Sequence, residues 1–442
     1  MKKRYDSYKP SGIDWIGDVP EHWVNTRIKF NILRSAAGVW GDDEKGDEND
    51  IVCFRIADFD YDERCLSTEK ITIRNIESKQ LEGRYLSKGD LLIEKSGGGE
   101  STPVGRVVYC NYNGKATYTN FIHSITLSDS VDSRFFLYYF NMLYSNKVNL
   151  LFFNQTTGLQ NLQVSDYLGQ SICLPPLSEQ QAIAAWLDEK CGEIDAAIAK
   201  VDREIELIDE LKQSEISRVV TRGLNPDTPL RPSGIDWIGN IPEHWAIRKV
   251  AQIFHGIGSG TTPTSGSNKY YSEDGVNWLQ TGDLNDGNIN DTSKKITTTA
   301  LIDFSSLKIY PKGSIVIAMY GATIGKLGKL NIETTTNQAC CVLPKSNEID
   351  NDFAFYVFWA GKRALINSAY GGGQPNISQD TIKSFKFALP PLSEQQAIAD
   401  YLDKKCAEID GLKAKLSKKR ETLTELRQSI ISEVVTGKRK VI

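Results

Sequence analysis

The chain of 442 residues repeats itself, and this repetition constrains its fold more than any other feature. The segment SGIDWIGDVPEHW at 11–23 recurs at 233–245 with eleven of thirteen positions identical, and LPPLSEQQAIA at 174–184 recurs unchanged at 389–399. Between these shared islands the two copies differ in sequence. Such internal similarity indicates a duplicated architecture rather than one large core.

The repeat divides the chain into four stretches. We expect a first mixed domain at 1–173, a helical spacer at 174–222, a second mixed domain at 223–388 and a second helical spacer at 389–442. The second mixed domain opens with GLNPDTPLRPSG at 223–234, whose three prolines and two glycines are typical of a linker.

Both spacers are predicted to be long helices. Ser178 and Gln181 fit a capping box directly after a Pro-Pro pair, and the same letters recur at 393–396. Apolar or cysteine positions then follow at steps of four and three, which is the seam of a coiled coil; in the first spacer they are 187, 191, 194, 198, 201, 205 and 208. An exposed seam of this length needs a partner. The second copy in the same chain is the expected one, and an intermolecular pairing, in which the rod serves dimerisation, is the alternative.

The mixed domains combine β-rich segments with one aromatic-rich helix each. The β-rich segments lie at 51–59, 90–95, 105–110 and 121–127 in the first copy, and at 313–320 and 337–344 in the second. The helices are expected at 133–146 and 351–367. The predicted fold class is therefore α+β, with two similar α/β domains joined by two long helices.

Composition argues against catalysis on this chain. The four histidines show no ligand spacing with each other or with cysteine, so no metal site is expected. GATIGKLG at 321–328 fails as a phosphate-binding loop, because it has three residues between its first two glycines and no Ser or Thr after the lysine. We expect a binding protein without a cofactor. The net charge of −4 means that any binding to nucleic acid must rest on local groups, and the acidic run at 41–50 is expected to face away from phosphates.

The expected compartment is the cytoplasm. The start MKKRYDSYKPSG has no apolar region behind it and is not a secretory signal, and the chain has no run of about 18 apolar residues that could span a membrane. The eight cysteines include no CxxC pair and are expected to stay free or buried thiols.

Polar and glycine-rich loops at matched positions are the candidate binding residues. Glycine lets backbone approach a ligand, polar side chains donate to phosphates, and Asn, Gln and Arg read base edges. Ordinary turns use the same residue types. However, the two copies place such residues at matched positions and use different residues there, which is typical of two domains that bind different ligands. The first copy offers Lys95, Ser96, Gly97, Gly98, Gly99, Ser101, Arg106, Thr119, Asn120, Gln160 and Asn161. The second copy offers Ser259, Gly260, Thr261, Thr262, Lys269, Tyr270, Tyr320, Gly321, Thr323, Lys326, Thr336, Asn337, Gln338, Gln374 and Asn376.

These motifs resemble those of the specificity subunit of type I restriction–modification systems. The resemblance rests on SGIDWIG-x-x-PEHW, GSGTTP at 258–263, GATIGK at 321–326, TNQA at 336–339, and LPPLSEQQAIA before a long helix. It covers essentially the whole chain, and the doubled layout is its most specific part. The first copy departs from it at 35–43, which reads SAAGVWGDD, so the resemblance assigns no contact residues there.

The resemblance implies two target-recognition domains whose connecting helices pack antiparallel, with internal pseudo-twofold symmetry. Each domain would read one half of a bipartite, asymmetric site in double-stranded DNA, and the helices would hold the spacing. The implied partners are methyltransferase subunits, expected to be two, which carry S-adenosylmethionine, and motor–nuclease subunits that join through the complex. The chain itself is implied to be non-catalytic.

Two alternatives stay open at this stage. The chain could be a scaffold that carries two modules for ligands other than nucleic acid on a coiled-coil rod. The repeated tryptophans, Trp15 with Trp237 and Trp23 with Trp245, could dock a partner subunit, or they could pin the start of each module onto its core.

Overall fold

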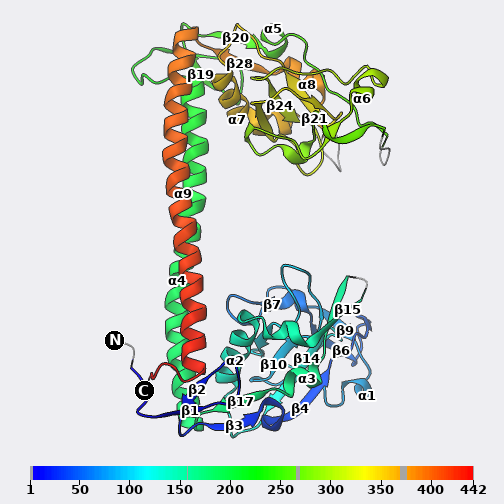
Figure 1. The fold of residues 1–442 in the computed structure, drawn as a ribbon, viewed down its shortest axis with the longest axis vertical. Coiled ribbons are helices and arrows are strands. Elements are labelled where there is room, and N and C mark those ends of the chain that lie inside the picture. Colours follow the sequence, from blue (N-terminus) through cyan, green and yellow to red (C-terminus); the bar gives the residue numbers. More distant parts are fainter. Residues whose placement is uncertain (1–2, 157, 265–268, 369–375, 442) are drawn as a thin grey trace. The chain divides into compact units, whose positions relative to one another are not determined.

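The computed structural model describes residues 3–156, 158–264, 269–368 and 376–441. The chain forms two compact units (Figure 1): unit 1 comprises Met1–Arg203 with Ser417–Ile442, and unit 2 comprises Glu204–Leu416. Each unit holds one mixed domain and segments of both long helices, α4 (Leu177–Arg222) and α9 (Leu392–Val435). This division follows packing, whereas the expected limits at 173, 222 and 388 follow the sequence repeat and stay a prediction.

A six-stranded sheet with the order β4–β14–β10–β12–β8–β7 forms the centre of unit 1. Its strands are β4 (Ile32–Ala37), β7 (Phe59–Asp60), β8 (Cys65–Leu66), β10 (Leu91–Glu94), β12 (Val107–Tyr109) and β14 (Ile122–Leu127). Every residue of β10 is buried, because strands flank it on both edges and both faces are covered. Leu91 and Ile93 join the core that contains helix α2 (Ser133–Ser145), and Leu92 joins a second core on the opposite face.

Smaller sheets surround this centre, in the orders β1–β2, β17–β3, β13–β6–β9–β5 and β11–β16–β15. Their strands are β1 (Tyr8–Pro10), β2 (Asp18–Pro20), β3 (Val24–Arg27), β5 (Asp42–Asp43), β6 (Asp50–Phe54), β9 (Ile73–Asn75), β11 (Ser96–Gly97), β13 (Ala116–Tyr118), β15 (Phe153–Thr156), β16 (Leu159–Leu162) and β17 (Ser171–Leu174). The expected strand at 51–59 is broken: β6 ends at Phe54 and a 3-10 turn follows at Ile56–Asp58. Short helices lie at α1 (Ser78–Leu81) and α3 (Val164–Leu168).

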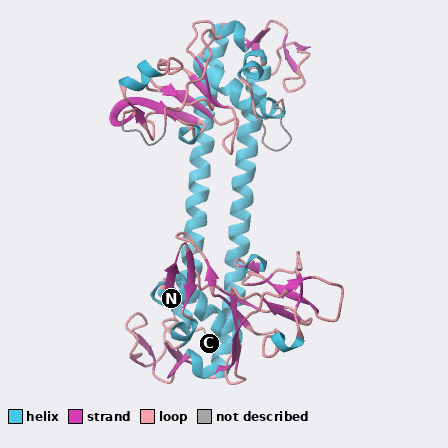
Figure 2. Ribbon diagram, turned by 90° about the vertical axis from the view of Figure 1, so that its right-hand side faces the viewer, coloured by secondary structure: helices cyan, strands magenta, loops and turns pink. Residues whose placement is uncertain are grey.

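Unit 2 repeats this plan with sheets β22–β25–β24–β27, β23–β21–β26, β20–β28 and β18–β19. Its strands are β18 (Leu230–Pro232), β19 (Asn240–Pro242), β20 (Ala246–Lys249), β21 (Tyr271–Leu279), β22 (Gly287–Ile289), β23 (Lys295–Ile296), β24 (Ile315–Ala318), β25 (Leu327–Leu330), β26 (Thr335–Thr336), β27 (Cys340–Leu343) and β28 (Lys386–Leu389). Its helices besides α4 and α9 are α5 (Val250–Ile253), α6 (Thr298–Asp303), α7 (Asn351–Asn367) and α8 (Gln379–Ser384). Figure 2 shows the strands of unit 2 beside its segments of the long helices.

The two aromatic-rich helices confirm the prediction and begin in the same way. The Asp132 carboxylate caps α2 by accepting hydrogen bonds from the backbone N–H groups two and three residues further along the chain. Asp350 caps α7 with the same geometry. The buried aromatic side chains of α2 include Phe135, Phe136 and Phe140, which fill the core of unit 1. The matched helix α7 fills the core of unit 2.

Within each unit, the segments of α4 and α9 run antiparallel and are joined by ion pairs. These pairs are Asp195–Arg427 and Asp202–Arg420 in unit 1, and Asp209–Lys413 and Lys212–Asp410 in unit 2. In each unit the residue number along α9 falls as that along α4 rises, which is the signature of antiparallel pairing. The expected pairing within one chain is therefore confirmed, and the seam is covered without a second copy.

The seam itself is buried most fully toward the mixed domains. In α4, Leu187, Cys191, Ile194 and Val201 are buried, whereas positions 198, 205 and 208 are half-buried. The start of α4 differs from the prediction, because the helix begins at Leu177 and Ser178 lies inside its first turn rather than at its cap. The Gln180 side chain instead donates to the Pro175 carbonyl at 2.9 Å and accepts from the Asp132 backbone N–H. This repeated glutamine therefore joins the start of α4 to the start of α2.

None of the helices in the described ranges has an apolar stretch long enough for a bilayer crossing. All eight cysteines lie in those ranges as unpaired thiols, and seven of them are buried.

Candidate nucleic-acid interface

The repeated opening signature anchors each mixed domain to α4 or α9. In unit 1, the Glu179 carboxylate of α4 accepts from the Trp23 indole N–H at 3.3 Å and from the Tyr5 hydroxyl at 2.6 Å. In unit 2, the Glu394 carboxylate of α9 accepts from the Trp245 indole N–H at 3.1 Å. Both indoles are buried, so this tryptophan pair pins the modules to their cores and offers no docking surface.

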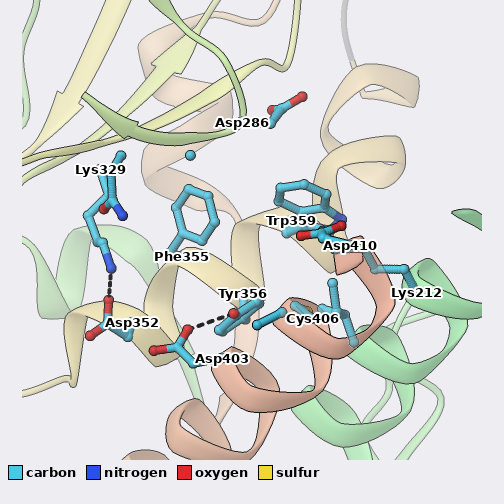
Figure 3. Close-up of a pocket in the computed structure, with 14 residues that line it drawn as sticks. Lys212, Asp286, Lys329, Asp352, Phe355, Tyr356, Trp359, Asp403, Cys406 and Asp410 are labelled. Carbon is cyan, nitrogen blue, oxygen red and sulfur yellow. Dashed lines mark hydrogen bonds and ion pairs between the residues drawn. The ribbon is translucent and has the colours of Figure 1, made fainter. Parts of the chain in front are cut away.

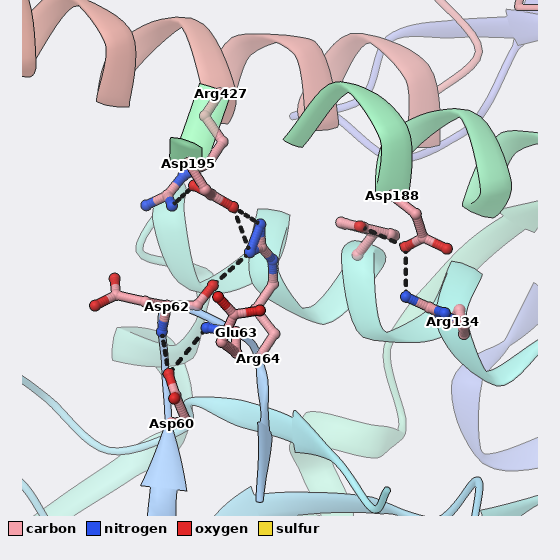
Figure 4. Close-up of polar contacts among 9 residues, drawn as sticks. Asp60, Asp62, Glu63, Arg64, Arg134, Asp188, Asp195 and Arg427 are labelled. Atoms are coloured by element: carbon pink, nitrogen blue, oxygen red, sulfur yellow. Dashed lines mark hydrogen bonds and ion pairs between the residues drawn. The ribbon is translucent and has the colours of Figure 1, made fainter. Parts of the chain in front are cut away.

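A second set of contacts joins the module of unit 1 to the long helices (Figure 4). Arg64, in the turn between β7 and β8, donates twice to the Asp195 carboxylate at 2.8 and 3.1 Å, and Arg427 donates to the other oxygen of that carboxylate. Close by, Asp188 accepts from Arg134 and from the Tyr138 hydroxyl, each at 2.7 Å. Burial and this hydrogen bond raise the pKa of Tyr138, so the phenol stays protonated and keeps donating.

Unit 2 has the same carboxylates but lacks the arginine (Figure 3). The Tyr356 hydroxyl donates to Asp403 at 2.7 Å, as Tyr138 does to Asp188, and Asp410 is held by Lys212. Strand pairing places Cys65 opposite Tyr109 in unit 1 and Asn288 opposite Lys329 in unit 2, so Gly287 stands where unit 1 has Arg64.

A cavity of about 270 Å³ lies between α7 and the two long helices of unit 2, and its lining includes Lys212, Asp286, Gly287, Asp403 and Asp410. No group of three or more His, Cys, Asp or Glu side chains in the described part of the chain could hold a metal ion.

The polar loops of unit 1 come together beside the edge of the main sheet. β11 pairs with β16, which places Ser96 opposite Asn161, and the Ser96 hydroxyl donates to the Asn161 amide oxygen at 2.7 Å. The backbone N–H groups of Lys95 and Ser96 both donate to the Phe121 carbonyl. Asn120 and Asn161 are exposed and Lys95 and Ser96 are half-buried, so this group stays available to a ligand.

Three predicted contact residues of unit 1 are buried or held by contacts within the unit. Thr119 is buried and cannot reach a ligand. Gln160 is buried as well, because its amide holds the turn that contains Gly97, Gly98, Gly99 and Ser101: it accepts from the Val104 backbone N–H and donates to the Gly99 carbonyl. Arg106 donates twice to the buried Glu94 carboxylate, at 2.8 and 3.2 Å, and stacks 3.6 Å from the centre of the Tyr61 ring.

The loops of unit 2 form two groups. The first joins 259–262 to 336–338: the Ser259 hydroxyl accepts from Gln379, the Thr261 carbonyl accepts from the Trp278 indole, and the Thr262 hydroxyl donates to the Gln338 amide oxygen at 2.7 Å. The second joins Tyr320 to Asn376 through an antiparallel bridge, next to a turn in which Gly321 is exposed and Thr323 and Lys326 are half-buried. Gln374 lies outside the described residues.

Several predicted contacts of unit 2 are also structural. Thr336 is fully buried and its hydroxyl accepts from the Gly260 backbone N–H at 3.0 Å, while Asn337 is buried and accepts from the Ala339 N–H. Gly260 is buried too, and a Cβ there would lie 1.7 Å from the Thr336 carbonyl oxygen. Lys269 and Tyr270 both contact Asp303, at 2.6 and 3.1 Å, so the charge of this lysine is offset.

Sequence reasoning missed an exposed aromatic pair at the loops of unit 1. Trp40 and Phe121 are 47% and 37% exposed, and their ring centres lie 6.3 Å apart. Gly38 marks their place in the loop: a Cβ at Gly38 would lie 2.2 Å from the Tyr118 carbonyl oxygen, which is the close approach that Gly260 makes to the Thr336 carbonyl oxygen. SAAGVWGDD thus occupies the place of GSGTTP, and Trp40 matches Thr262.

The acidic run at 41–50 lies directly after Trp40, and several of its carboxylates have partners within the chain. Asp42 pairs with Lys45 at 2.9 Å, and this contact lowers the pKa of the Asp42 carboxyl. Asp43 pairs with Arg74, and Asp50 accepts from Asn75. Whether the run faces away from phosphates stays a prediction.

Comparison with known proteins gives one consistent result. The sequence profile described as "Type I restriction modification DNA specificity domain" matches residues 42–206 and 242–419. The putative type I restriction enzyme MjaX specificity subunit of Methanocaldococcus jannaschii is 25% identical over 441 residues, covering 96% of each chain. The MjaVIII specificity subunit of the same organism is 27% identical over 304 residues, which span 64% of this chain and 66% of the relative. A chain from a solved type I R-M system shares the fold with a TM-score of 0.71 at 16% identity, covering 94% of this chain and 98% of that one.

Proposed function

The chain belongs to the family of type I restriction modification DNA specificity proteins, and from this membership we propose that it is the DNA-recognition subunit of a type I restriction–modification complex. Each unit reads one half of a bipartite, asymmetric duplex target through its exposed loops. The length of the two long helices sets the number of base pairs that are left unread between the halves.

One observation carries this proposal: the two units keep the same scaffold contacts and differ where their loops are exposed. Glu179 and Glu394 each accept a hydrogen bond from the equivalent tryptophan of their unit. Asp188 and Asp403 each accept one from the equivalent tyrosine hydroxyl. The exposed loop residues differ at matched positions. Two equal scaffolds with unequal reading surfaces are what a site with two different halves requires.

The chemistry belongs to partner subunits in this proposal. A net charge of −4 makes the chain a weak binder of DNA by bulk attraction, so partners that dock on the repeated surfaces must add phosphate contacts. We infer that two methyltransferase subunits dock there and supply S-adenosylmethionine and base flipping. Motor–nuclease subunits join through that complex. The work takes place in the cytoplasm, where the DNA lies.

The test is to express the full chain with the methyltransferase subunits of its own system and to map methylated bases in genomic DNA. The expected result is one bipartite motif with adenines modified in both halves. The matched control omits this chain, which should leave the genome without that motif. A complex that forms but methylates no recurring motif would contradict the proposal and favour the scaffold alternative.

A further inference from the structure

A carboxylate and an aromatic ring hold the Arg64 guanidinium in unit 1. Its N–H groups donate two hydrogen bonds to the Asp195 carboxylate of α4, at 2.8 and 3.1 Å. The central carbon of the guanidinium lies 5.8 Å from the centre of the Tyr138 ring, which is within the range of a cation–π contact. Unit 1 therefore contains a working guanidinium site whose ligand is supplied by the chain itself.

Unit 2 repeats the residues that contact this guanidinium. The helix sequence LDEKCGEID recurs as LDKKCAEID, and in each unit a tyrosine hydroxyl donates to the first aspartate of that sequence. The matched pairs are Asp195 with Asp410 and Tyr138 with Tyr356. Asp410 and Tyr356 both line the cavity of unit 2 (Figure 3), so the carboxylate and the ring of the guanidinium site are present there as well.

A glycine stands at the position of Arg64 in unit 2. Strand pairing places Gly287 there, and a Cβ added at Gly287 meets only the Asn285 side-chain oxygen, at 3.4 Å. The backbone of unit 2 therefore leaves room for a side chain at this position. Gly287, Tyr356 and Asp410 together line the cavity of about 270 Å³.

The carboxylates that line this cavity outnumber the lysines that pair with them. Three of the carboxylates have a lysine partner; these pairs are Asp286–Lys362, Asp352–Lys329 and Asp410–Lys212. The fourth, Asp403, accepts from the Tyr356 hydroxyl at 2.7 Å and contacts no lysine or arginine among the described residues. One negative charge at the cavity is thus left without a cation.

The equivalent charge of unit 1 is balanced. Asp188, which matches Asp403, accepts from the Arg134 guanidinium at 2.7 Å. Arg134 lies two residues after the capping aspartate of α2, and Asp352 lies two residues after that of α7, so a carboxylate stands in unit 2 where unit 1 has this arginine. Unit 2 therefore keeps both aspartates of unit 1 but lacks both arginines, which makes its cavity attractive to a cation.

The walls of the cavity favour an organic cation. Phe355 and Trp359 line it beside Tyr356, and the Lys212 ammonium already lies 5.3 Å from the centre of the Trp359 ring. Aromatic rings next to carboxylates suit a group that contacts a ring face and donates hydrogen bonds at the same time. A metal ion fits less well, since no three acidic, His or Cys side chains of the described ranges are grouped to hold one.

We propose that the cavity of unit 2 binds a guanidinium or alkylammonium group, which donates to Asp403 and Asp410 and lies against the Tyr356 ring. A free small cation and a basic side chain of a partner subunit share this chemistry, and the experiment distinguishes them. The proposal goes beyond the proposed function and does not depend on it, because no contact with DNA enters the argument.

The test titrates the full chain with agmatine, which carries a guanidinium and an ammonium on a short carbon chain, in isothermal titration calorimetry. Butylurea, of similar shape but uncharged, is the control compound. The variant G287R supplies the arginine of unit 1, and D403N removes a charge while keeping an oxygen for Tyr356. The control variant G282R adds the same side chain at an exposed glycine that does not line the cavity and has no atom within 4 Å of an added Cβ.

The full chain should bind one agmatine with a dissociation constant of about 1 mM or tighter, and butylurea far more weakly. G287R should abolish the binding and raise the unfolding temperature of unit 2, because the built-in arginine fills the cavity. D403N should weaken the binding by about tenfold, since a hydrogen bond to a charged group is lost, and G282R should bind as the unchanged chain does. Repeating the titration on the complex with methyltransferase subunits identifies the source: binding lost in the complex assigns the cavity to a partner's basic side chain, and binding kept assigns it to a free cation.

Four results overturn the inference. These are an absence of saturable agmatine binding by the full chain, equal binding of butylurea, unchanged binding in a folded G287R chain, and an equal loss of binding in G282R and G287R. Thermal unfolding of each variant shows whether unit 2 is folded. If G287R does not fold, D403N and the comparison with butylurea decide the question.

Discussion

Arg64 is expected to be a strong polar link between the module of unit 1 and its long helices. Its guanidinium donates two hydrogen bonds to Asp195, and its side chain is only 11% exposed. Hydrogen bonds to charged groups contribute about 1.5–3 kcal/mol each. Both bonds here share one oxygen, and Arg427 stays on the same carboxylate after substitution, so R64A should cost about 2–3 kcal/mol rather than the larger penalty of a stranded charge.

This loss should appear in one unit only. For a unit of this size, 1 kcal/mol shifts the midpoint by about 2–4 °C, so R64A should lower the unfolding temperature of unit 1 by about 5–10 °C in differential scanning calorimetry. Unit 2, which has Gly287 at the matched place, should unfold as before. The matched control is R420A, whose ion pair with Asp202 is about half exposed and should contribute less than about 1 kcal/mol. The reasoning is refuted if R64A and R420A shift the transition by the same amount.

Three further predictions follow from other contacts within the units. G260A should destabilise unit 2 by about 3 kcal/mol or more, because the added Cβ overlaps the Thr336 carbonyl, whereas G282A meets no atom within 4 Å and should cost far less; chemical denaturation compares them. E179A should lower the stability of unit 1 by about 2–4 kcal/mol in the same assay, since the Trp23 and Tyr5 donors lose their buried acceptor, and E179Q should cost less because it keeps an oxygen there. Burial and the Lys95 ammonium lower the pKa of His123 to about 4, so the unfolded chain binds the proton first and unit 1 should lose stability as the pH falls from about 6.5 toward 4; H123Q should remove that part of the pH dependence in thermal unfolding.

The helices and strands were readable from the sequence because their signals are periodic. Steps of four and three residues predicted α4 and α9, and the two ion pairs in each unit confirm the antiparallel direction there. The predicted capping box at Ser178 is wrong, because the Pro176 carbonyl already accepts from the first helical N–H groups. The helix therefore starts ahead of Ser178. The local sequence predicted the start of the helix to within one residue. The hydrogen bonds of its polar side chains depend on tertiary contacts, which the local sequence does not show.

The candidate contacts were harder to predict, because a polar residue type does not show whether the side chain is free to bind a ligand or forms hydrogen bonds with the backbone. Thr119 and Thr336 have polar side chains, yet both are buried in their units. Exposed residues of the same loops lie one or two positions away. Phe121 was missed because an aromatic residue beside a strand is typical of a core, and only the structure shows its ring at the surface.

The central claim is that each unit reads one half of the target, and a chain with two copies of one module tests it most directly. Residues 246–388 are replaced by a copy of 24–173, the chimaera is expressed with the methyltransferase subunits, and the methylated motif is mapped on genomic DNA. We expect a bipartite motif whose two halves have become the same, both equal to one half of the original target. An unchanged asymmetric motif would show that the halves are not assigned to the units and would contradict the account.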